Sequence, residues 1–283
     1  ARPGKAGFRG RSFLITGAAS GLGRLLATRV AERGGRVVAW DVDAHGLASL
    51  AEELPGISTR VCDLASRTEI AMAAAEAREL CGGGPDVVVN NAGVVSGRPF
   101  LECSDQQVEL TMAVNAMAPM WVAREFLPKM LEDNRGHLVT VASSAGFVGV
   151  NQLVDYCASK HAAVGFNEAL RFELHKLGKR GVRTTCVCPF FIHTGMFEGV
   201  RTRFPWLLPI LQPEWVADRI VWALARQEPM VICPWFVRSV FLCKFLFPTW
   251  LSDVLARFFG LSESMASFIG RRGEGSGARL KDA

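Results

Sequence analysis

The stretch RSFLITGAASGLGRLLATRVAERGGRVVAWD (residues 11–41) decides the fold. It contains a short apolar strand, a glycine-rich turn, a helix with an apolar face, and a second strand that ends in an acid. Gly17, Gly21 and Gly23 permit a tight turn and a close backbone approach to a pyrophosphate at the helix N-terminus, where unpaired N–H groups favour anions. Ser20 and Leu22 lie in the same turn, so we expect these five residues to contact a dinucleotide.

Asp41 ends the second strand, eighteen residues after Gly23. A carboxylate at this place accepts hydrogen bonds from both ribose hydroxyls and repels a 2′-phosphate. The sequence therefore predicts NAD over NADP. Arg24 and Arg36 keep NADP open as an alternative, and a solvated aspartate at a strand end is the competing interpretation.

Strands and helices alternate along the rest of the chain. Largely apolar runs predict strands buried on both faces, and stretches with a 3.6-residue period predict helices between them. The expected strands lie within 11–17, 36–41, 58–63, 86–93, 136–144, 182–189 and 229–234, and the expected helices span 22–33, 44–53, 67–81, 105–131, 155–177 and 214–226. We therefore predict an α/β fold of the Rossmann type, a doubly wound sheet of seven parallel strands in a single domain.

The composition fits a globular enzyme better than a nucleic-acid-binding or disordered protein. Of the 283 residues 49% are hydrophobic and 21% charged, and the net charge of +5 is not gathered into a basic stripe. The eight cysteines form no C-x-x-C pair, so we expect free thiols and no metal site. The first ten residues do not resemble a secretory signal; because the chain opens with Ala1, we expect an N-terminal piece to have been removed.

Other polar and small residues fall at the ends of successive strands. Asn90, Ala92 and Gly93 end the fourth strand, and Asp63 and Leu64 follow the third. In a parallel sheet these positions meet at the carboxyl edge, where such sheets bind ligands. We expect Asp63 to touch an adenine edge and the Ala92-Gly93 surface to lie against adenosine.

Tyr156 is the only tyrosine in the chain, and Lys160 follows it four residues later. On a helix the two side chains lie one turn apart on the same face. An adjacent ammonium and an oxidised nicotinamide ring favour the phenolate, which would lower the pKa of Tyr156 and let it exchange a proton with an alcohol. The alternative is an ordinary tyrosine and lysine on a buried helix.

With TGAASGLG, NNAG, Asn115, Ser143 and YCASK in this order, residues 10–235 resemble the short-chain dehydrogenase/reductase family. Within it, residues 139–166 and 194–221 are similar to the membrane-associated retinol and 17β-hydroxysteroid dehydrogenase branch. The resemblance implies that Asn115, Ser143, Tyr156 and Lys160 are catalytic. In that family Ser143 (or Ser144, if the register slips by one) bonds the substrate oxygen, and Lys160 also holds the nicotinamide ribose.

Further roles come from the same resemblance. The backbone of Asn115 would bind a water that links Lys160 to solvent, and Pro189, Ile192 and Thr194 would meet the nicotinamide carboxamide. The family usually carries Pro-Gly where this chain has Pro189-Phe190. Phe190 must then take a backbone geometry that glycine normally supplies, or the loop must follow another course.

The end of the chain is apolar. We expect residues 1–235 to form a dinucleotide-binding catalytic domain with a substrate lid at 190–213, which carries Phe197, Phe204, Trp206, Leu207, Leu208, Ile210 and Leu211. The extension 236–270 combines aromatic with basic residues, which favours a helix lying at a membrane surface; a pocket cap or a subunit interface are the alternatives. We expect residues 271–283 to be a disordered tail.

These observations predict an NAD-dependent oxidoreductase for a lipophilic alcohol, with all-trans-retinol favoured and a 17β-hydroxysteroid second. A protein that binds NAD(H) at a lipid surface with little turnover is the alternative from another class. The resemblance also implies a homodimer. We expect it at the cytoplasmic face of the endoplasmic reticulum or on a lipid droplet, with no nucleic-acid partner.

Overall fold

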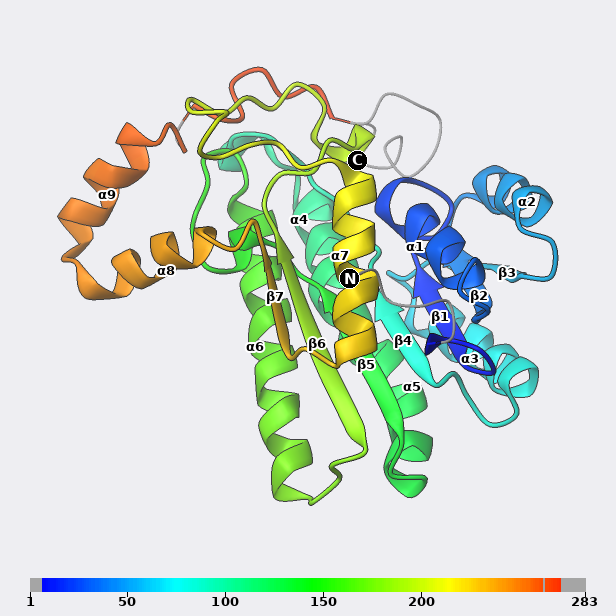
Figure 1. The fold of residues 1–283 in the computed structure, drawn as a ribbon. Coiled ribbons are helices and arrows are strands. Elements are labelled where there is room, and N and C mark those ends of the chain that lie inside the picture. The colour runs from blue at the N-terminus through cyan, green and yellow to red at the C-terminus, as the bar shows by residue number, and fades with distance from the viewer. Residues whose placement is uncertain (1–6, 262, 271–283) are drawn as a thin grey trace.

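The computed structural model describes residues 7–261 and 263–270, with the backbone alone at 240–243 and 245. Figure 1 shows a twisted sheet with helices on both faces. The tail predicted to be disordered, 271–283, lies outside the described residues.

The sheet has seven parallel strands in the order β3-β2-β1-β4-β5-β6-β7. They are β1 Ser12–Thr16, β2 Arg36–Asp41, β3 Ser58–Val61, β4 Val87–Asn90, β5 Gly136–Val141, β6 Val182–Pro189 and β7 Met230–Cys233. Each lies within a predicted run, so the Rossmann-type fold is confirmed. The strand order reverses between β1 and β4, and such a switch point leaves a crevice at the carboxyl ends of the two strands.

Two apolar layers hold the helices to the sheet. On one face α1 (Gly21–Ala31), α2 (Ala44–Glu53) and α7 (Pro213–Arg226) pack against β1, β2 and β4 through residues such as Leu26, Leu50 and Ile220. On the other face lie α3 (Arg67–Cys81), α5 (Ala118–Glu132) and α6 (Val154–Lys176), with Ile70, Phe126 and Leu170 in the core. The doubly wound arrangement follows from strands that are apolar on both sides.

Local signals set where the helices begin. Ser104 starts α4 (Asp105–Met112) with a full capping box, in which its hydroxyl accepts the Gln107 N–H and the Gln107 side chain accepts the Ser104 N–H. Asp43 and Ser66 cap α2 and α3, and Pro213 occupies the first turn of α7.

The structure differs from the predicted helix 105–131 at its centre. A π-helical turn, Ala113–Met117, separates α4 from α5, and Asn115 lies in it. Such turns occur inside helices frequently at functional sites.

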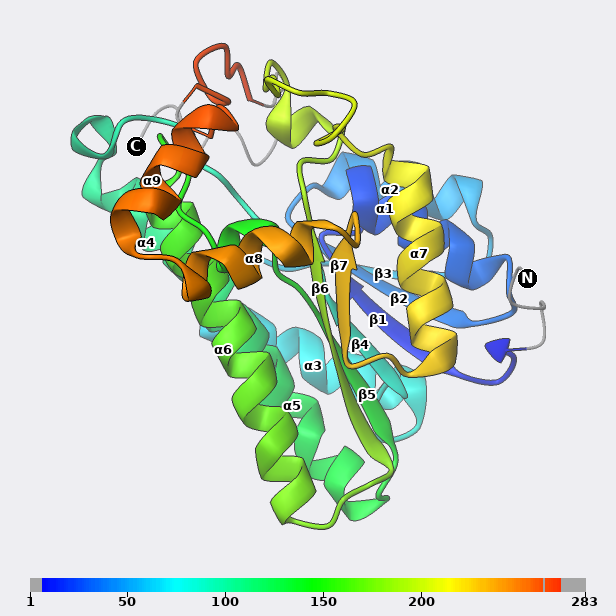
Figure 2. The same cartoon turned by 60° about the vertical axis from the view of Figure 1, so that its left-hand side comes forward.

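The C-terminal extension forms two helices, α8 (Val237–Leu246) and α9 (Thr249–Phe258), with Pro248 at the N-cap of α9. They leave the sheet after β7 and project beyond it (Figure 2). The chain then returns, and Met265 is buried in a cluster with Val95 and Tyr156. None of the described helices is both long enough and apolar enough to cross a bilayer.

Candidate active site

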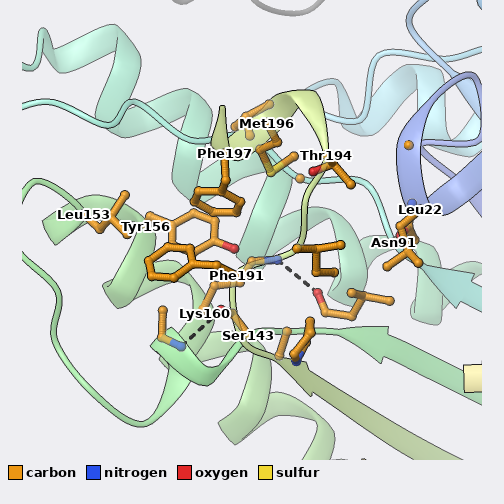
Figure 3. A pocket seen from close by; sticks show the side chains of 18 of the residues that line it. Leu22, Asn91, Ser143, Leu153, Tyr156, Lys160, Phe191, Thr194, Met196 and Phe197 are labelled. Atoms are coloured by element: carbon orange, nitrogen blue, oxygen red, sulfur yellow. Dashed lines mark hydrogen bonds between the residues drawn. The ribbon is translucent and has the colours of Figure 1, made fainter. Parts of the chain in front are cut away.

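One pocket runs along the carboxyl edge of the sheet and holds nearly all the predicted site residues (Figure 3). Of those residues, the pocket is lined by Gly17, Ser20, Gly21, Leu22, Gly23, Asp41, Asp63, Leu64, Ala92, Gly93, Ser143, Tyr156, Lys160, Pro189, Ile192 and Thr194. Asn90 and Asn115 do not line it. The sheet edge thus joins a glycine-rich loop, an acid, and a hydroxyl–phenol–amine group in one cavity.

In the β1–α1 loop and the first turn of α1 it is mainly the backbone that faces the pocket, because three of these residues are glycines. Gly17 has φ +67°, and a Cβ built on it would lie 2.8 Å from the Ala92 Cα; a Cβ on Gly23 would overlap the Gly17 carbonyl oxygen. Ser20 at the N-cap of α1 makes no side-chain capping bond, whereas Asp43 and Ser66 do so at α2 and α3. A helix start of this kind fits the pyrophosphate of a dinucleotide.

Asp41 braces the same loop from the end of β2. Its Oδ2 accepts the Ala19 N–H at 2.9 Å and its Oδ1 accepts the Asp43 N–H at 3.0 Å. Two carboxylate oxygens have about four acceptor positions, so acceptor capacity remains toward the pocket that Asp41 lines.

The side chain of Asn90 turns to the α5 side of the sheet, so a contact of Asn90 with the cofactor stays a prediction. Asn90 is buried, and its amide donates to the Pro119 carbonyl at 3.5 Å. The next residue, Asn91, lines the pocket instead and donates to the Thr16 and Gly17 carbonyls at 2.9 and 3.3 Å. Alternation along the strand is the signal that could have found Asn91, since neighbouring side chains point to opposite faces.

Tyr156 lies at the centre of the pocket, in the first turns of α6. Its ring is 5% exposed, and the Phe197 ring packs edge-on against it with the centroids 5.7 Å apart. The Ser143 side chain lies close enough to the Tyr156 hydroxyl to lower the pKa of Tyr156. Lys160 Nζ lies 5.5 Å from the centroid of the Tyr156 ring and donates to the Val141 carbonyl at 3.0 Å. The predicted serine, tyrosine and lysine are therefore together.

The pKa of Tyr156 departs from the sequence-based expectation. Burial raises it well above its usual value, and the nearby Ser143 side chain lowers it by less. Burial also lowers the pKa of Lys160 to about 8, although the nearby Cys186 and Cys188 act in the opposite direction. The lysine alone therefore does not make the phenol acidic, because both groups are withdrawn from water.

The positions of Ser143 and Ser144 indicate which of the two would contact a substrate oxygen. Both line the pocket, but Ser143 is the one whose side chain lies close enough to the Tyr156 hydroxyl to lower its pKa, and its oxygen also accepts the Ala145 N–H at 3.1 Å. A substrate oxygen beside Tyr156 would therefore meet Ser143.

Asn115 lies beneath the pocket and connects two of its walls. Its Oδ1 accepts the Val94 N–H at 2.8 Å, and its Nδ2 donates to the Val94 carbonyl and to the Ser159 hydroxyl at 2.9 and 3.1 Å. A Cβ on Gly93 would come within 3.3 Å of Asn115 Oδ1 and 3.6 Å of Lys160 Nζ. The side chain of Asn115 thus fixes the β4 end against α6, and the water-binding role of its backbone stays a prediction.

The Pro189-Phe190 step does not need glycine geometry. Among the described residues other than glycine, only Asn134, Gln152 and Gln227 have positive φ. The Phe190 N–H donates to the Cys233 carbonyl at 2.7 Å, and its ring lies 4.9 Å from that of Phe191. The loop therefore follows an ordinary backbone course, and Phe190 adds an aromatic wall to the pocket.

The end of the pocket beyond Tyr156 is apolar. Sequence reasoning named Phe197 and Leu208 from the lid, and both line it. It missed the other apolar residues there, which are Val148, Val150, Leu153, Phe191, Met196, Phe259 and Leu261. Phe259 and Leu261 follow α9, so the returning C-terminal segment forms part of the pocket wall.

No described group of three or more histidine, cysteine, aspartate or glutamate side chains could hold a metal ion. The seven cysteines whose side chains the structure describes are free thiols, and Cys186 and Cys188 share one face of β6 with their Sγ atoms 3.6 Å apart.

Comparison with known proteins adds to this geometry. A family profile described as short chain dehydrogenase matches residues 11–204. Short-chain dehydrogenase/reductase family 16C member 6 of Bos taurus is 43% identical over 94% of this chain and 85% of its own length. Epidermal retinol dehydrogenase 2 of Mus musculus is 40% identical over 93% of this chain and 86% of its own length.

Two solved structures share the fold. A short-chain dehydrogenase/reductase from Burkholderia phymatum in complex with NAD superposes with a TM-score of 0.76 at 27% identity, covering 88% of this chain and 96% of that one. A metagenomic short-chain oxidoreductase in complex with NADP gives a TM-score of 0.66 at 28% identity, covering 80% and 97%.

Proposed function

The chain belongs to the short-chain dehydrogenase/reductase family, and on this premise we propose that it is an NAD-dependent oxidoreductase for a lipophilic alcohol, with all-trans-retinol and retinaldehyde as the favoured pair. The observation that carries the proposal is the single pocket, which holds the glycine-rich loop, the Ser143–Tyr156–Lys160 group and the apolar end in continuity. Independently of this proposal, the chain is a short-chain dehydrogenase/reductase enzyme related to the retinol dehydrogenases.

Each polar residue then has a chemical task. Tyr156 accepts the alcohol proton during oxidation and returns it during reduction, because its hydroxyl faces the pocket from a rigid helix. Ser143 orients the substrate oxygen beside it, because its hydroxyl lies in the same pocket next to Tyr156. Lys160 holds the ribose of the cofactor and supplies positive charge below Tyr156. The nicotinamide, when bound, takes up or gives back the hydride.

The preference for NAD rests on the charges around Asp41. Arg24, the nearest candidate to hold a 2′-phosphate, bonds Glu53 at 2.7 Å and the Ala19 and Gly46 carbonyls at 3.4 and 3.2 Å. Arg36 stands at the opposite end of β2, about 17 Å from Asp41 at 3.3 Å per residue. Arg36 is therefore too far from Asp41 to offset the repulsion of a phosphate, and the Arg24 guanidinium is already paired with Glu53.

A retinoid fits the apolar end because its polyene offers only carbon and hydrogen to Phe191, Phe197 and their neighbours. Each buried methylene contributes about 0.8 kcal/mol. The relatives point the same way, since several are retinol dehydrogenases. A 17β-hydroxysteroid remains the second candidate.

Assembly, domain division and location belong to the same proposal. We assign residues 1–235 to the catalytic domain with its lid at 190–213, and 236–270 to a lipid surface and the pocket wall. A homodimer would pair α5 and α6 with their copies, and Val154 and Phe172 are exposed apolar residues of α6 available to it. We place the protein at the cytoplasmic face of the endoplasmic reticulum or on a lipid droplet.

Purified protein should convert retinol and NAD⁺ to retinaldehyde and NADH, faster than it oxidises a 17β-hydroxysteroid. Activity on small polar alcohols alone would contradict the proposed lipophilic substrate.

Asp41→Asn keeps an acceptor for the Ala19 N–H and removes the charge, so the ratio of kcat/KM for NAD to that for NADP should fall by about tenfold or more. Tyr156→Phe should bind NADH normally and lose turnover, and equal rates would favour a binding protein without catalysis.

A further inference from the structure

A buried carboxylate lies directly beside Tyr156. Asp155 precedes Tyr156 in the first turn of α6 and is 4% exposed. Its hydrogen-bond partner is the hydroxyl of Ser96, which lies 2.9 and 2.8 Å from the two carboxylate oxygens. A carboxylate that leaves water usually gains a cation or several donors in exchange. A pairing with one neutral hydroxyl therefore requires an explanation.

The start of a helix does not explain why this carboxylate is buried. The N-cap of α6, Leu153, makes no side-chain capping bond, and the helix dipole favours a negative charge in the first turn. An exposed aspartate gains the same benefit, as Asp105 does in the first turn of α4. The reason for the burial of Asp155 must therefore lie in the segment that packs against it.

That segment follows β4. Residues 93–97 have no regular secondary structure, and we call them the strap. The backbone groups of such a segment need partners elsewhere. At Val94 both the N–H and the carbonyl bond the side chain of Asn115, at 2.8 and 2.9 Å. At Ser96 the side chain bonds Asp155, so the strap has two anchors with Val95 between them.

Both anchors reach α6 next to Tyr156. The Asn115 amide donates to the Ser159 hydroxyl at 3.1 Å, and Ser159 donates to the Tyr156 carbonyl at 2.7 Å. The other anchor, from Ser96, ends on Asp155, the residue before Tyr156. The strap is therefore tied to the turn of α6 that carries the phenol, once on each side of it.

The strap also takes part in the packing around Tyr156. Val95 is 9% exposed and belongs to the same buried cluster as Tyr156 and Met265. Gly97 has φ +64°, and a Cβ on it would overlap the Phe268 ring. The strap thus lies between α6 and the returning C-terminal segment, and a loosened strap would change what packs around the phenol.

A hydrogen bond here determines position more than stability. Replacing both partners of a buried polar pair by apolar groups of similar shape is often nearly neutral for stability. A hydrogen bond, however, has a narrow range of length and direction. The bond from Ser96 to Asp155 therefore sets where the strap lies relative to α6.

We propose that Ser96 and Asp155 are positioning residues for Tyr156. Their hydrogen bond fastens the strap to the first turn of α6, and the fastened strap keeps the phenol directed at the substrate oxygen. The inference rests on the proposed function, in which Tyr156 exchanges the proton of the alcohol.

The test combines amide hydrogen exchange of the strap with steady-state oxidation of retinol, both on the full chain. Ser96→Ala removes the donor, so exchange at residues 93–97 should become about tenfold faster or more. Its kcat should fall about tenfold or more, because a misplaced catalytic group loses rate, while KM for NAD⁺ should stay within about threefold. Asp155→Asn keeps an oxygen that accepts from Ser96 and should hold both exchange and kcat within about threefold of wild type.

The matched control is Ser12→Ala. Ser12 is 1% exposed, and its hydroxyl donates to the Asp86 carboxylate at 3.1 Å. The change therefore also breaks a serine–aspartate bond, but at the amino end of β1, whereas the pocket lies at the carboxyl edge of the sheet. Its strap exchange and its kcat should match wild type.

Unchanged strap exchange in Ser96→Ala, or faster exchange with a wild-type kcat, would overturn the proposal. So would a parallel rise in KM for NAD⁺, which would assign the pair to the cofactor. An Asp155→Asn variant as slow as Ser96→Ala would overturn it too, because the charge and not the hydrogen bond would then matter.

A wild type that does not oxidise retinol would contradict the proposed substrate, and the phenolate absorbance of Tyr156 then replaces kcat as the measurement. The downward shift of its titration caused by NAD⁺ should be smaller in Ser96→Ala than in wild type by about half a pH unit or more, because the phenol is held less closely to the ring charge. An equal shift in both proteins would overturn the positioning role.

Discussion

Tyr156 faces opposite demands in the two directions of the proposed reaction. As a proton donor in reduction it should be neutral, and burial that raises its pKa keeps it so. As a base in oxidation it needs stabilising positive charge. Lys160 offers this 5.5 Å from the ring centroid, but burial lowers the lysine pKa to about 8. A second positive charge, that of an oxidised nicotinamide, is therefore required for the phenolate.

We predict that NAD⁺ lowers the pH at which Tyr156 ionises. The free chain should show phenolate absorbance only above the pH usual for tyrosine, and saturating NAD⁺ should shift the titration down by about one pH unit or more, since an opposite charge nearby typically moves a pKa by that amount. Because the chain has one tyrosine, the phenolate band that appears on ionisation reports this residue alone, whereas the absorbance of the seven tryptophans does not titrate.

Two controls accompany that titration. Tyr156→Phe should abolish the signal, and NADH, which lacks the ring charge, should shift it less than NAD⁺. An identical titration with and without NAD⁺ would contradict the assignment of Tyr156 as the base.

At the scale of elements, the β1–α1 loop depends on a glycine for two separate reasons. Gly17 has positive φ, and a Cβ on it would press against the Ala92 Cα at the end of β4. Gly56 also has positive φ, +93°, but a Cβ there meets nothing within 4 Å. Comparing alanine substitutions at Gly17 and Gly56 therefore separates the effect of backbone strain from that of steric contact.

We predict that Gly56→Ala lowers the free energy of unfolding by about 1–2 kcal/mol, the cost of a left-handed alanine. Gly17→Ala should lower it by more, because the contact of its Cβ with the Ala92 Cα adds to that cost. Gly17→Ala alone should also weaken NADH binding by about tenfold or more, because the loop must move from β4. Thermal unfolding and NADH fluorescence titration measure the two effects. Equal NADH affinity in both variants would mean that the loop position does not control the cofactor.

The elements whose signals are local could be predicted from the sequence. Ser104 with Gln107, and Pro213 with Glu214, mark helix starts by chemistry within one turn, and the helices α4 and α7 begin there. The π-helical turn at Asn115 could not be predicted. The side-chain bonds from Asn115 to Val94 and Ser159, 21 and 44 residues away, accompany that turn, and no local pattern records them.

At the scale of the molecule, the pocket wall shows why sequence reasoning found the polar site and missed much of the apolar one. Tyr156, Lys160 and Ser143 fall at strand and helix ends whose positions follow from the fold. Phe259 and Met265 reach the site only because the chain returns from α9, where the Ser264 carbonyl accepts the Arg201 N–H and the Glu198 carbonyl accepts the Ile269 N–H. Such closure depends on tertiary packing alone.

The stability of the whole domain should depend on one buried histidine. His137 in β5 is 2% exposed; its Nε2 lies 2.8 Å from the Thr185 hydroxyl, which itself donates to the Glu228 carbonyl. That hydroxyl proton is committed, so Nε2 carries its own hydrogen, as in a neutral ring. Burial first, then the positive charges of Arg11 and Arg183, lower the pKa of His137 to about 4.

The pKa of His137 is lower in the folded chain than its usual value of 6.5, so on acidification the unfolded chain binds the proton first. The contribution of neutral His137 to the free energy of unfolding is therefore complete above about pH 6.5 and is lost as the pH falls toward 4. Over this range the difference in pKa corresponds to about 3 kcal/mol. We predict that His137→Gln lowers stability at pH 7 but flattens this acid loss, whereas His175→Gln, an exposed change on α6, leaves the wild-type slope. Urea unfolding from pH 7.5 to 4 measures both, and parallel slopes for wild type and His137→Gln would show that the acid sensitivity lies elsewhere.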